Sequence, residues 1–153
     1  MPDAFNQNMR IVLQRVSRAR VVVGDRTIAQ IGPGLVLLVG VGPADQAQQA
    51  RYLAEKIAHL RIFEDQDGKM NRSLLDVGGE AIVVSQFTLY ADTRRGRRPS
   101  FTDAAHPHIA QPLVEQFTSY LSELGIHTQS GEFGAHMLIE ISNDGPVTII
   151  LER

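Results

Sequence analysis

A run of small polar side chains closes a strongly apolar, β-branched segment of the chain. Ser85-Gln86-Phe87-Thr88-Leu89 follows Ala-Ile-Val-Val at residues 81–84. Its hydroxyl groups could attack an acyl carbon, but an isolated serine or threonine is seldom a nucleophile without a base beside it. The Gly-x-Ser-x-Gly turn of α/β-hydrolases is missing. Taken alone, the segment is therefore most simply interpreted as the end of a strand, with Phe87 and Leu89 in the core and Thr88 in solvent.

A second polar segment, Asn143-Asp144-Gly145-Pro146-Val147-Thr148, separates two β-branched runs. Asn, Asp, Gly and Pro all favour turns, so these residues alone indicate a hairpin. The Gly145-Pro146 bond could also be cis, but only about 5–6% of X-Pro bonds in folded proteins are. The pattern therefore leaves the isomer unassigned.

The chain carries a single dense basic cluster, within residues 93–101. Four arginines surround a glycine there, namely Arg94, Arg95, Arg97 and Arg98. Guanidinium groups present forked donors that match phosphate oxygens, so this segment could contact an RNA backbone. A solvated loop is the competing interpretation. The formal net charge of −2 argues against a general nucleic-acid coat.

Metal and thiol chemistry have little support. His106-x-His108 could bind a metal, but no carboxylate cluster accompanies it at a recognisable spacing, and a solvent-exposed helix entry explains it better. The absence of cysteine excludes a disulfide, a thiolate nucleophile and a Cys-based zinc site. We predict no metal and no cofactor.

The polar segments must be positioned by a mixture of strands and two main helices. Apolar residues at helical spacing predict helices over residues 47–58 and from Pro107 to about 124, with Pro112 expected to kink the second. β-branched runs predict strands at 10–16, 19–23, 27–31, 35–41, 61–63, 80–87, 137–142 and 147–151. This order indicates a single α+β domain whose mixed, mostly antiparallel sheet curls toward a β-barrel.

Length and composition fit one domain. The 153 residues have an ordinary apolar fraction of 43%. Residues 1–8 lack periodicity and are predicted to be an N-terminal extension of a domain at 9–153. No apolar run approaches the roughly 20 residues that span a bilayer, and no secretory leader is evident, so a cytoplasmic location is expected.

Together these segments resemble the D-aminoacyl-tRNA deacylases, which hydrolyse the ester between a D-amino acid and tRNA. Residues 85–89 and 143–148 match the two signature motifs of that family. Gly-x-Phe-Gly-Ala-x-Met at 131–137 matches it too, as does the Arg-Pro-Ser-Phe segment ending at Phe101. The resemblance covers most of the chain.

The resemblance implies a catalytic wall made of Ser85, Gln86, Phe87 and Thr88. Backbone N–H groups near Phe87 and Thr88 would hold the oxyanion of a tetrahedral intermediate. We favour water as the attacking group, assisted by the terminal ribose hydroxyl of the tRNA, with Thr88 ordering the site. Gln86 would support the substrate end or its water. Phe133 and Met137 would line the adenosine or amino-acid pocket, although a core position suits them equally well.

The resemblance also implies that Gly145-Pro146 is cis and enters the active site of a partner subunit in a homodimer. Main-chain carbonyl oxygens there would bind the α-ammonium group. Backbone would then clash with an L-residue and leave room for a D-residue. Glycine has no Cβ to clash, so glycyl-tRNA, such as glycine mischarged on tRNA-Ala, should also be hydrolysed. The arginine cluster would contact the 3′ acceptor end.

Three rival functions remain at this stage. A small-molecule esterase would use Ser85 or Thr88 with a histidine and form an acyl-enzyme. A non-catalytic RNA-binding module would explain the arginines but not the two motifs. A purely structural dimer would have no affinity for tRNA. Comparing hydrolysis of D- and L-tyrosyl-tRNA separates all of these from a chiral deacylase.

Overall fold

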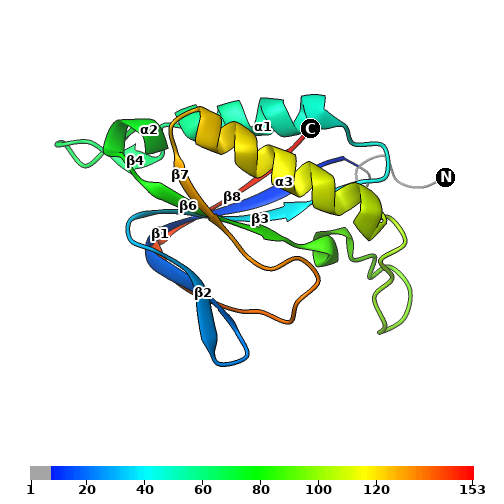
Figure 1. Cartoon of the computed structure of the whole chain (residues 1–153). Coiled ribbons are helices and arrows are strands. Elements are labelled where there is room, and N and C mark those ends of the chain that lie inside the picture. The colour runs from blue at the N-terminus through cyan, green and yellow to red at the C-terminus, as the bar shows by residue number, and fades with distance from the viewer. Residues whose placement is uncertain (1–7) are drawn as a thin grey trace.

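The computed structural model describes residues 8–153, in which two helices cover one face of a strongly curled sheet (Figure 1). The helices are α1 (Ala47–His59) and α3 (Pro107–Glu123), with a short α2 (Leu74–Val77) and a 3-10 turn, η2 (Phe87–Tyr90). The main sheet comprises β1 (Arg10–Val23), β2 (Arg26–Ile31), β3 (Gly34–Gly40), β6 (Glu80–Ser85), β7 (His127–Ser130) and β8 (Leu138–Glu152). A separate ribbon pairs β4 (Phe63–Glu64) with β5 (Met70–Arg72).

The long strand β1 organises the sheet. One of its edges pairs with β8 along nearly its whole length, while the other pairs first with β3 and then with β2. The parallel strands β6 and β7 continue the sheet beyond β3. The Gln129 side chain of β7 then reaches β2, where it accepts from the Gln30 amide at 2.8 Å and donates to the Gln30 carbonyl at 2.7 Å. These two bonds draw the ends of the sheet together, so the predicted α+β fold with a sheet curled toward a barrel is confirmed.

Strand alternation produces two cores. Ile11, Leu13 and Leu37 point toward the helices and join the buried side chains of α1 and α3. The opposite face of the sheet forms a smaller cluster that includes Val36 and Ile82. This second face is open at one end, where Ile150 is 65% exposed. The helix-covered core fixes the end of β6 against α3, and that junction contains the polar motif at 85–88.

Two expected strand breaks are absent. Residues 10–23 form one strand, although two strands were predicted there. Residues 138–152 likewise form one continuous strand, so the predicted hairpin at Gly145-Pro146 is wrong. Thr148 pairs with Gln14 and Asn143 with Val16, which leaves residues 144–147 opposite Arg15 alone. The turn-forming residues therefore make a bulge in an edge strand, because extra residues can loop out of a ladder without ending it.

Smaller differences concern the ends of elements. β7 and β5 were not predicted, since His-Thr-Gln-Ser and Met-Asn-Arg have no apolar alternation. β6 ends at Ser85, two residues earlier than expected. Pro112 does not interrupt α3; its ring removes one hydrogen bond to the carbonyl of His108, which lies in the exposed first turn. None of the described helices is long and apolar enough to cross a membrane.

The predicted N-terminal extension lies almost wholly outside the described residues, since residues 1–7 are not described. Met9 already belongs to the folded domain. Its side chain is fully buried and its amide donates to Asp45 Oδ1 at 3.1 Å.

Candidate active site

The polar motif at the end of β6 forms a tight turn against the edge of β3. The Gln86 amide donates to the Val39 carbonyl at 2.8 Å, which carries the parallel pairing one residue past the strand. The chain then enters η2, closed by the Ala91 amide donating to the Thr88 carbonyl at 3.1 Å. Among residues 8–153, the amides of Phe87 and Thr88 donate to no protein acceptor, as expected for the first N–H groups of such a turn.

Arg10, which was not among the predicted site residues, supports this turn. Its Nη1 donates to the Leu89 carbonyl at 2.8 Å, while its Nε pairs with Glu152 at 2.9 Å. Beside it, Tyr90 is fully buried and its hydroxyl donates to the Asn8 carbonyl at 2.5 Å. Burial raises the pKa of Tyr90, so this phenol stays protonated and structural.

The Thr88 hydroxyl has an amide partner and no base. The Gln86 side chain donates through Nε2 to Thr88 Oγ1. A carboxamide cannot take up a proton, so this contact orients the hydroxyl without activating it as a nucleophile. That Thr88 orders the site stays a prediction.

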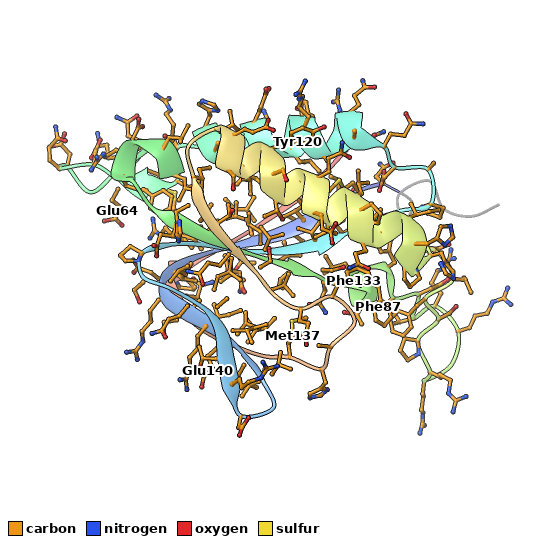
Figure 2. The ribbon with its side chains drawn as sticks, in the orientation of Figure 1. Glu64, Phe87, Tyr120, Phe133, Met137 and Glu140 are labelled. Atoms are coloured by element: carbon orange, nitrogen blue, oxygen red, sulfur yellow. The ribbon has the colours of Figure 1, made fainter. Side chains whose placement is uncertain are left out.

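A largely apolar cavity of about 470 Å³ opens beside the turn, under the start of α3. Phe87 is 58% exposed and packs edge-on against Phe101, with ring centroids 5.1 Å apart. The residues that line the cavity come from four segments and are Val41, Ser85, Phe87, Phe101, Ala104, Ala105, Pro107, Ala110, Phe133, Gly134, Ala135 and Met137. Figure 2 labels Phe87, Phe133 and Met137 around this end of the sheet. The structure thus brings together Ser85, Phe87, Phe133 and Met137 of the predicted site.

The Gly145-Pro146 bond is cis, in agreement with the resemblance. The bulge that carries it is closed by Asn143, whose Oδ1 accepts from the Val147 amide at 2.7 Å and whose Nδ2 donates to the Val147 carbonyl at 3.2 Å. Asp144, Gly145 and Pro146 are exposed. The Asn143 side chain therefore makes hydrogen bonds within the bulge, where the strand has no pairing with β1, and the tip of the bulge is exposed to solvent.

Arg15 fastens the bulge to the body of the protein. It is only 5% exposed, and its Nε donates to the Asp144 carbonyl at 2.9 Å while Nη1 donates to the Ile62 carbonyl at 2.7 Å. Its Nη2 lies 4.0 Å from Glu64 Oε1. Sequence reasoning missed this residue, although a signal existed: Arg15 continues the inward-facing series of Ile11 and Leu13, where a charge is unexpected.

The bulge and the catalytic turn do not meet within one chain. Ser85 is level with Val39 and Ile11, whereas the bulge lies opposite Arg15. Four residues along β1 correspond to about 13 Å, and the step from β6 across β3 and β1 to β8 adds about 14 Å sideways. In Figure 2, Glu64, whose carboxylate lies 4.0 Å from Arg15, and Phe87 are labelled on opposite sides of the view.

The arginine segment is a loop pinned by one of its own members. Residues 92 and 100 form an isolated bridge, and Arg94 binds Asp92 through its backbone amide, Nε and Nη2 at 2.9–3.1 Å. These bonds lower the pKa of Asp92 to about 2. Arg95, Arg97 and Arg98 are exposed around Gly96, which has a φ of 63°. Arg94 therefore shapes the loop, while the other three arginines face solvent.

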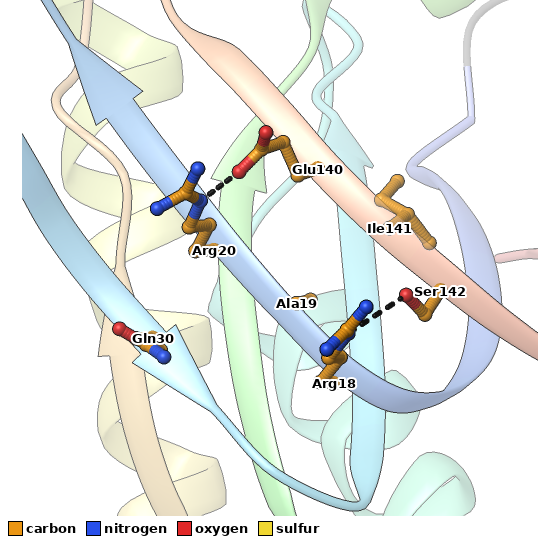
Figure 3. Close-up of a pocket in the computed structure, with 7 residues that line it drawn as sticks. All are labelled: Arg18, Ala19, Arg20, Gln30, Glu140, Ile141 and Ser142. Atoms are coloured by element: carbon orange, nitrogen blue, oxygen red, sulfur yellow. Dashed lines mark hydrogen bonds and ion pairs between the residues drawn. The ribbon is translucent and has the colours of Figure 1, made fainter.

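A separate cavity of about 460 Å³ lies over β1, β2 and β8 (Figure 3). Its arginines already have partners within the cavity, because Arg20 pairs with Glu140 and Arg18 Nε donates to Ser142 Oγ at 3.4 Å. None of the predicted site residues lines it. In the described part of the chain, no cluster of three or more His, Cys, Asp or Glu residues could hold a metal ion.

Comparison with known proteins assigns the chain to a family. The family model described as D-Tyr-tRNA(Tyr) deacylase matches residues 12–152. The chain belongs to this family. A relative from Roseiflexus sp. (strain RS-1), named D-aminoacyl-tRNA deacylase, is 61% identical over 94% of this chain and 93% of its own length. A relative of the same name from Halalkalibacterium halodurans is 55% identical over 94% of this chain and 99% of its own.

Solved structures share the architecture. The structure titled "c-Myc DNA Unwinding Element Binding Protein" superposes with a TM-score of 0.88 at 38% identity, covering 94% of this chain and 98% of that one. A probable eukaryotic D-amino acid tRNA deacylase has a TM-score of 0.84 at 15% identity, covering 96% of this chain and all of the other. The second likeness concerns the fold alone. The predicted family and enzyme class, a deacylase, are those of the curated relatives.

Proposed function

We propose that the protein hydrolyses the ester that joins a D-amino acid to the 3′ end of tRNA, releasing the free amino acid. The observation that carries this proposal is the turn at Phe87 and Thr88, whose two free amides open beside an apolar cavity in a member of a deacylase family. The amides stabilise the oxyanion as water attacks the ester carbon, and the terminal ribose hydroxyl of the tRNA assists the proton transfer. The cavity, lined by Phe133 and Met137, takes the terminal adenosine.

Chirality is judged by a second subunit. Gly145-Pro146 of one copy enters the site of the other, where its carbonyl oxygens bind the α-ammonium group and its backbone excludes an L-side chain. Two features support this division of the site. Within one chain the bulge is too far from Ser85 to act on the same substrate, and the open sheet face next to it carries the exposed Ile150. Such an apolar surface suits an isologous contact between two copies.

The first test compares D-tyrosyl-, L-tyrosyl- and glycyl-tRNA. We expect rapid hydrolysis of the D-ester, none above background of the L-ester, and measurable hydrolysis of glycyl-tRNA. A simple esterase would cleave both tyrosyl esters, and a binding module would cleave none. Exposed Arg95, Arg97 and Arg98 contact acceptor-stem phosphates, so replacing all three by glutamine should raise KM for the tRNA substrate and reduce its salt dependence.

The second test separates cross-subunit sites from sites within one chain. Phe87→Ala disables the catalytic turn and Gly145→Val disables the bulge, where a Cβ would lie 2.8 Å from the Val147 side chain. Each variant alone should be nearly inactive. Co-expressed at equal levels, they should recover about a quarter of wild-type activity, because half of randomly paired dimers contain one intact site of two. No recovery in verified mixed dimers would place both motifs in the same subunit.

A further inference from the structure

A second cavity adjoins the candidate active site and has no role in the proposed reaction. It holds about 410 Å³ and opens between α3 and the segment that follows β7. Val83 and Val114 form its apolar base. Polar residues lie beside this base, with Gln111, Glu115 and Thr118 on the helix side and Ser130 and Glu132 on the other. Most of the exposed lining is apolar, with polar groups beside it, and this combination suits a flat ligand that has apolar faces and polar edges.

The two cavities meet at Ser85 and Phe133, which line both. Phe133 is half-buried and contributes to the lining of both cavities. Aromatic side chains between adjacent recesses suit successive bases of a single strand, because every base can stack on an aromatic ring. If the terminal adenosine occupies the cavity beside the catalytic turn, the preceding nucleotide of the strand is the group that can reach the second cavity.

The helix wall matches the hydrogen-bonding edge of cytosine. Gln111 Nε2 donates to Glu115 Oε1 at 3.3 Å, one helical turn along α3, which orients the carboxylate and leaves its second oxygen and one amide N–H for a ligand. Cytosine offers an N4 amino donor beside the N3 acceptor, and a carboxylate is a fitting acceptor for N4. Uracil places a carbonyl oxygen where that amino group would be, and the carboxylate repels it.

We propose that this cavity binds the base of the penultimate nucleotide, the cytosine of the C-C-A end that all tRNAs carry. The inference rests on the proposed deacylase function and adds a subsite to it. Glu115 and Gln111 select cytosine, and Phe133 stacks between this base and the terminal adenine. Glu115 touches neither the ester nor the attacking water, so it is a specificity residue and not a catalytic one.

Three synthetic esters test the subsite: 3′-O-D-tyrosyl-adenosine and the D-tyrosyl esters of the dinucleotides CpA and UpA. With the wild-type protein, kcat/KM for the CpA ester should exceed that for the adenosine ester by about 5- to 10-fold, the size expected for one stacked and hydrogen-bonded base. The UpA ester should gain less than the CpA ester, because uracil keeps the stacking on Phe133 but presents a carbonyl oxygen to the Glu115 carboxylate. Equal values for all three esters would overturn the proposal.

Glu115→Gln tests the hydrogen-bonding pattern. A glutamine amide can donate to uracil O4, so this variant should lose the preference for CpA over UpA while its activity on the adenosine ester is unchanged. Glu123→Gln, at the exposed end of the same helix and outside the cavity, is the matched control and should keep the wild-type preference. A cytosine preference that survives Glu115→Gln unchanged would refute the assigned contact.

The two levels of the proposal fail in different ways. Hydrolysis of the adenosine ester without any gain from the added cytosine removes the subsite and leaves the deacylase function intact. A protein that hydrolyses neither the adenosine ester nor D-tyrosyl-tRNA overturns the function and the subsite together. Both exposed glutamates tolerate a neutral substitution without loss of the fold, which circular dichroism can check.

Discussion

Arg15 links three segments through one side chain, and this makes it a sensitive residue. A lysine there keeps the charge but has a single donor group in place of the guanidinium fork. We expect Arg15→Lys to lower the free energy of unfolding by about 2 kcal/mol, the scale of a lost hydrogen bond to a charged group. The loosened bulge should reduce kcat/KM for D-tyrosyl-tRNA by roughly 100-fold, since small displacements of positioning groups are costly.

Arg18 on the same strand provides the matched control. Its side chain is exposed and its contact with Ser142 is long, at 3.4 Å. Arg18→Lys should change the unfolding free energy by no more than about 0.5 kcal/mol and leave hydrolysis unaffected. Denaturant titration and initial rates measure both quantities. Equal effects of the two substitutions would mean that Arg15 has no special role in holding the bulge.

Thr88 allows a second prediction at this scale. Because its hydroxyl is bonded to the Gln86 amide and not to a base, Thr88→Ala should lower kcat by about ten-fold or less, as for a group that only orders the site. No acyl-enzyme should be trapped by rapid quenching of D-tyrosyl-tRNA turnover. A covalent adduct on Thr88, or a loss of activity above about a thousand-fold that Thr88→Ser restores, would assign it the nucleophile.

Residue types and motifs predicted many of the residues at the site, but not the arginines that hold its segments in position. Ser85, Phe87, Phe133 and Met137 do share one cavity, as the motifs suggested. Arg10 and Arg15 were missed because their function depends on what lies opposite them in the folded sheet. Arg94 was grouped with its neighbours, yet its partner Asp92 lies only two residues away. Local charge pairing of that kind is visible in the sequence.

At the scale of secondary-structure elements, the end of β3 and the turn η2 lie in unusually close contact. A Cβ at Gly40 would come within 2.6 Å of the Tyr90 ring and 3.3 Å of the Gln86 carbonyl. Gly40→Ala must therefore displace the turn, and we expect a loss of about 1–3 kcal/mol in unfolding free energy together with reduced hydrolysis. Gly32→Ala meets no atom within 4 Å and is the control. Wild-type activity of Gly40→Ala would imply that the position of the turn matters little.

The arginine loop makes a pH prediction. The pKa of Asp92 is about 2 in the folded protein, against an ordinary value of 3.8. A lowered carboxyl pKa stabilises the folded loop above about pH 4, and this contribution is lost as the pH falls through about 2. Carbon-13 NMR titration of the Asp92 carboxyl should show the low pKa, and Arg94→Gln should return it toward 3.8. Arg97→Gln should leave it unchanged; a shift of similar size there would implicate the general charge of the loop.

Element types followed from the sequence better than their ends. The apolar stripes of α1 and α3 and the buried runs of β3 and β6 were predicted because one face of each is covered. β8 was divided wrongly, since turn residues outweigh strand residues in any local reading. Pairing with β1 on both sides of the bulge overrides that preference. Pairing between distant strands cannot be predicted from the few residues on either side of the bulge.

At the scale of the whole molecule, one end of the sheet face that points away from the helices is exposed and apolar. Val12 of β1 pairs with Ile150 of β8 on one side and with Leu38 of β3 on the other. The three side chains therefore lie in one row, on the face of the sheet that points away from the helices. If a second copy covers this row, Ile150→Glu should produce monomers by sedimentation and reduce activity per subunit at least ten-fold. Met70→Glu, at an exposed site in β5, should remain dimeric and active. A fully active monomeric Ile150→Glu would exclude the cross-subunit site.

The bulge in β8 has a consequence for solubility as well. Within the described chain, the outer edge of this 15-residue strand pairs with no other strand, and long free edges recruit foreign strands into fibrils. A chain adding to that edge would lose register at residues 144–147 and could match only a short stretch on either side. We therefore expect the bulge to limit such additions, and a variant trimmed there to restore an even ladder should form fibrils more readily than the wild type.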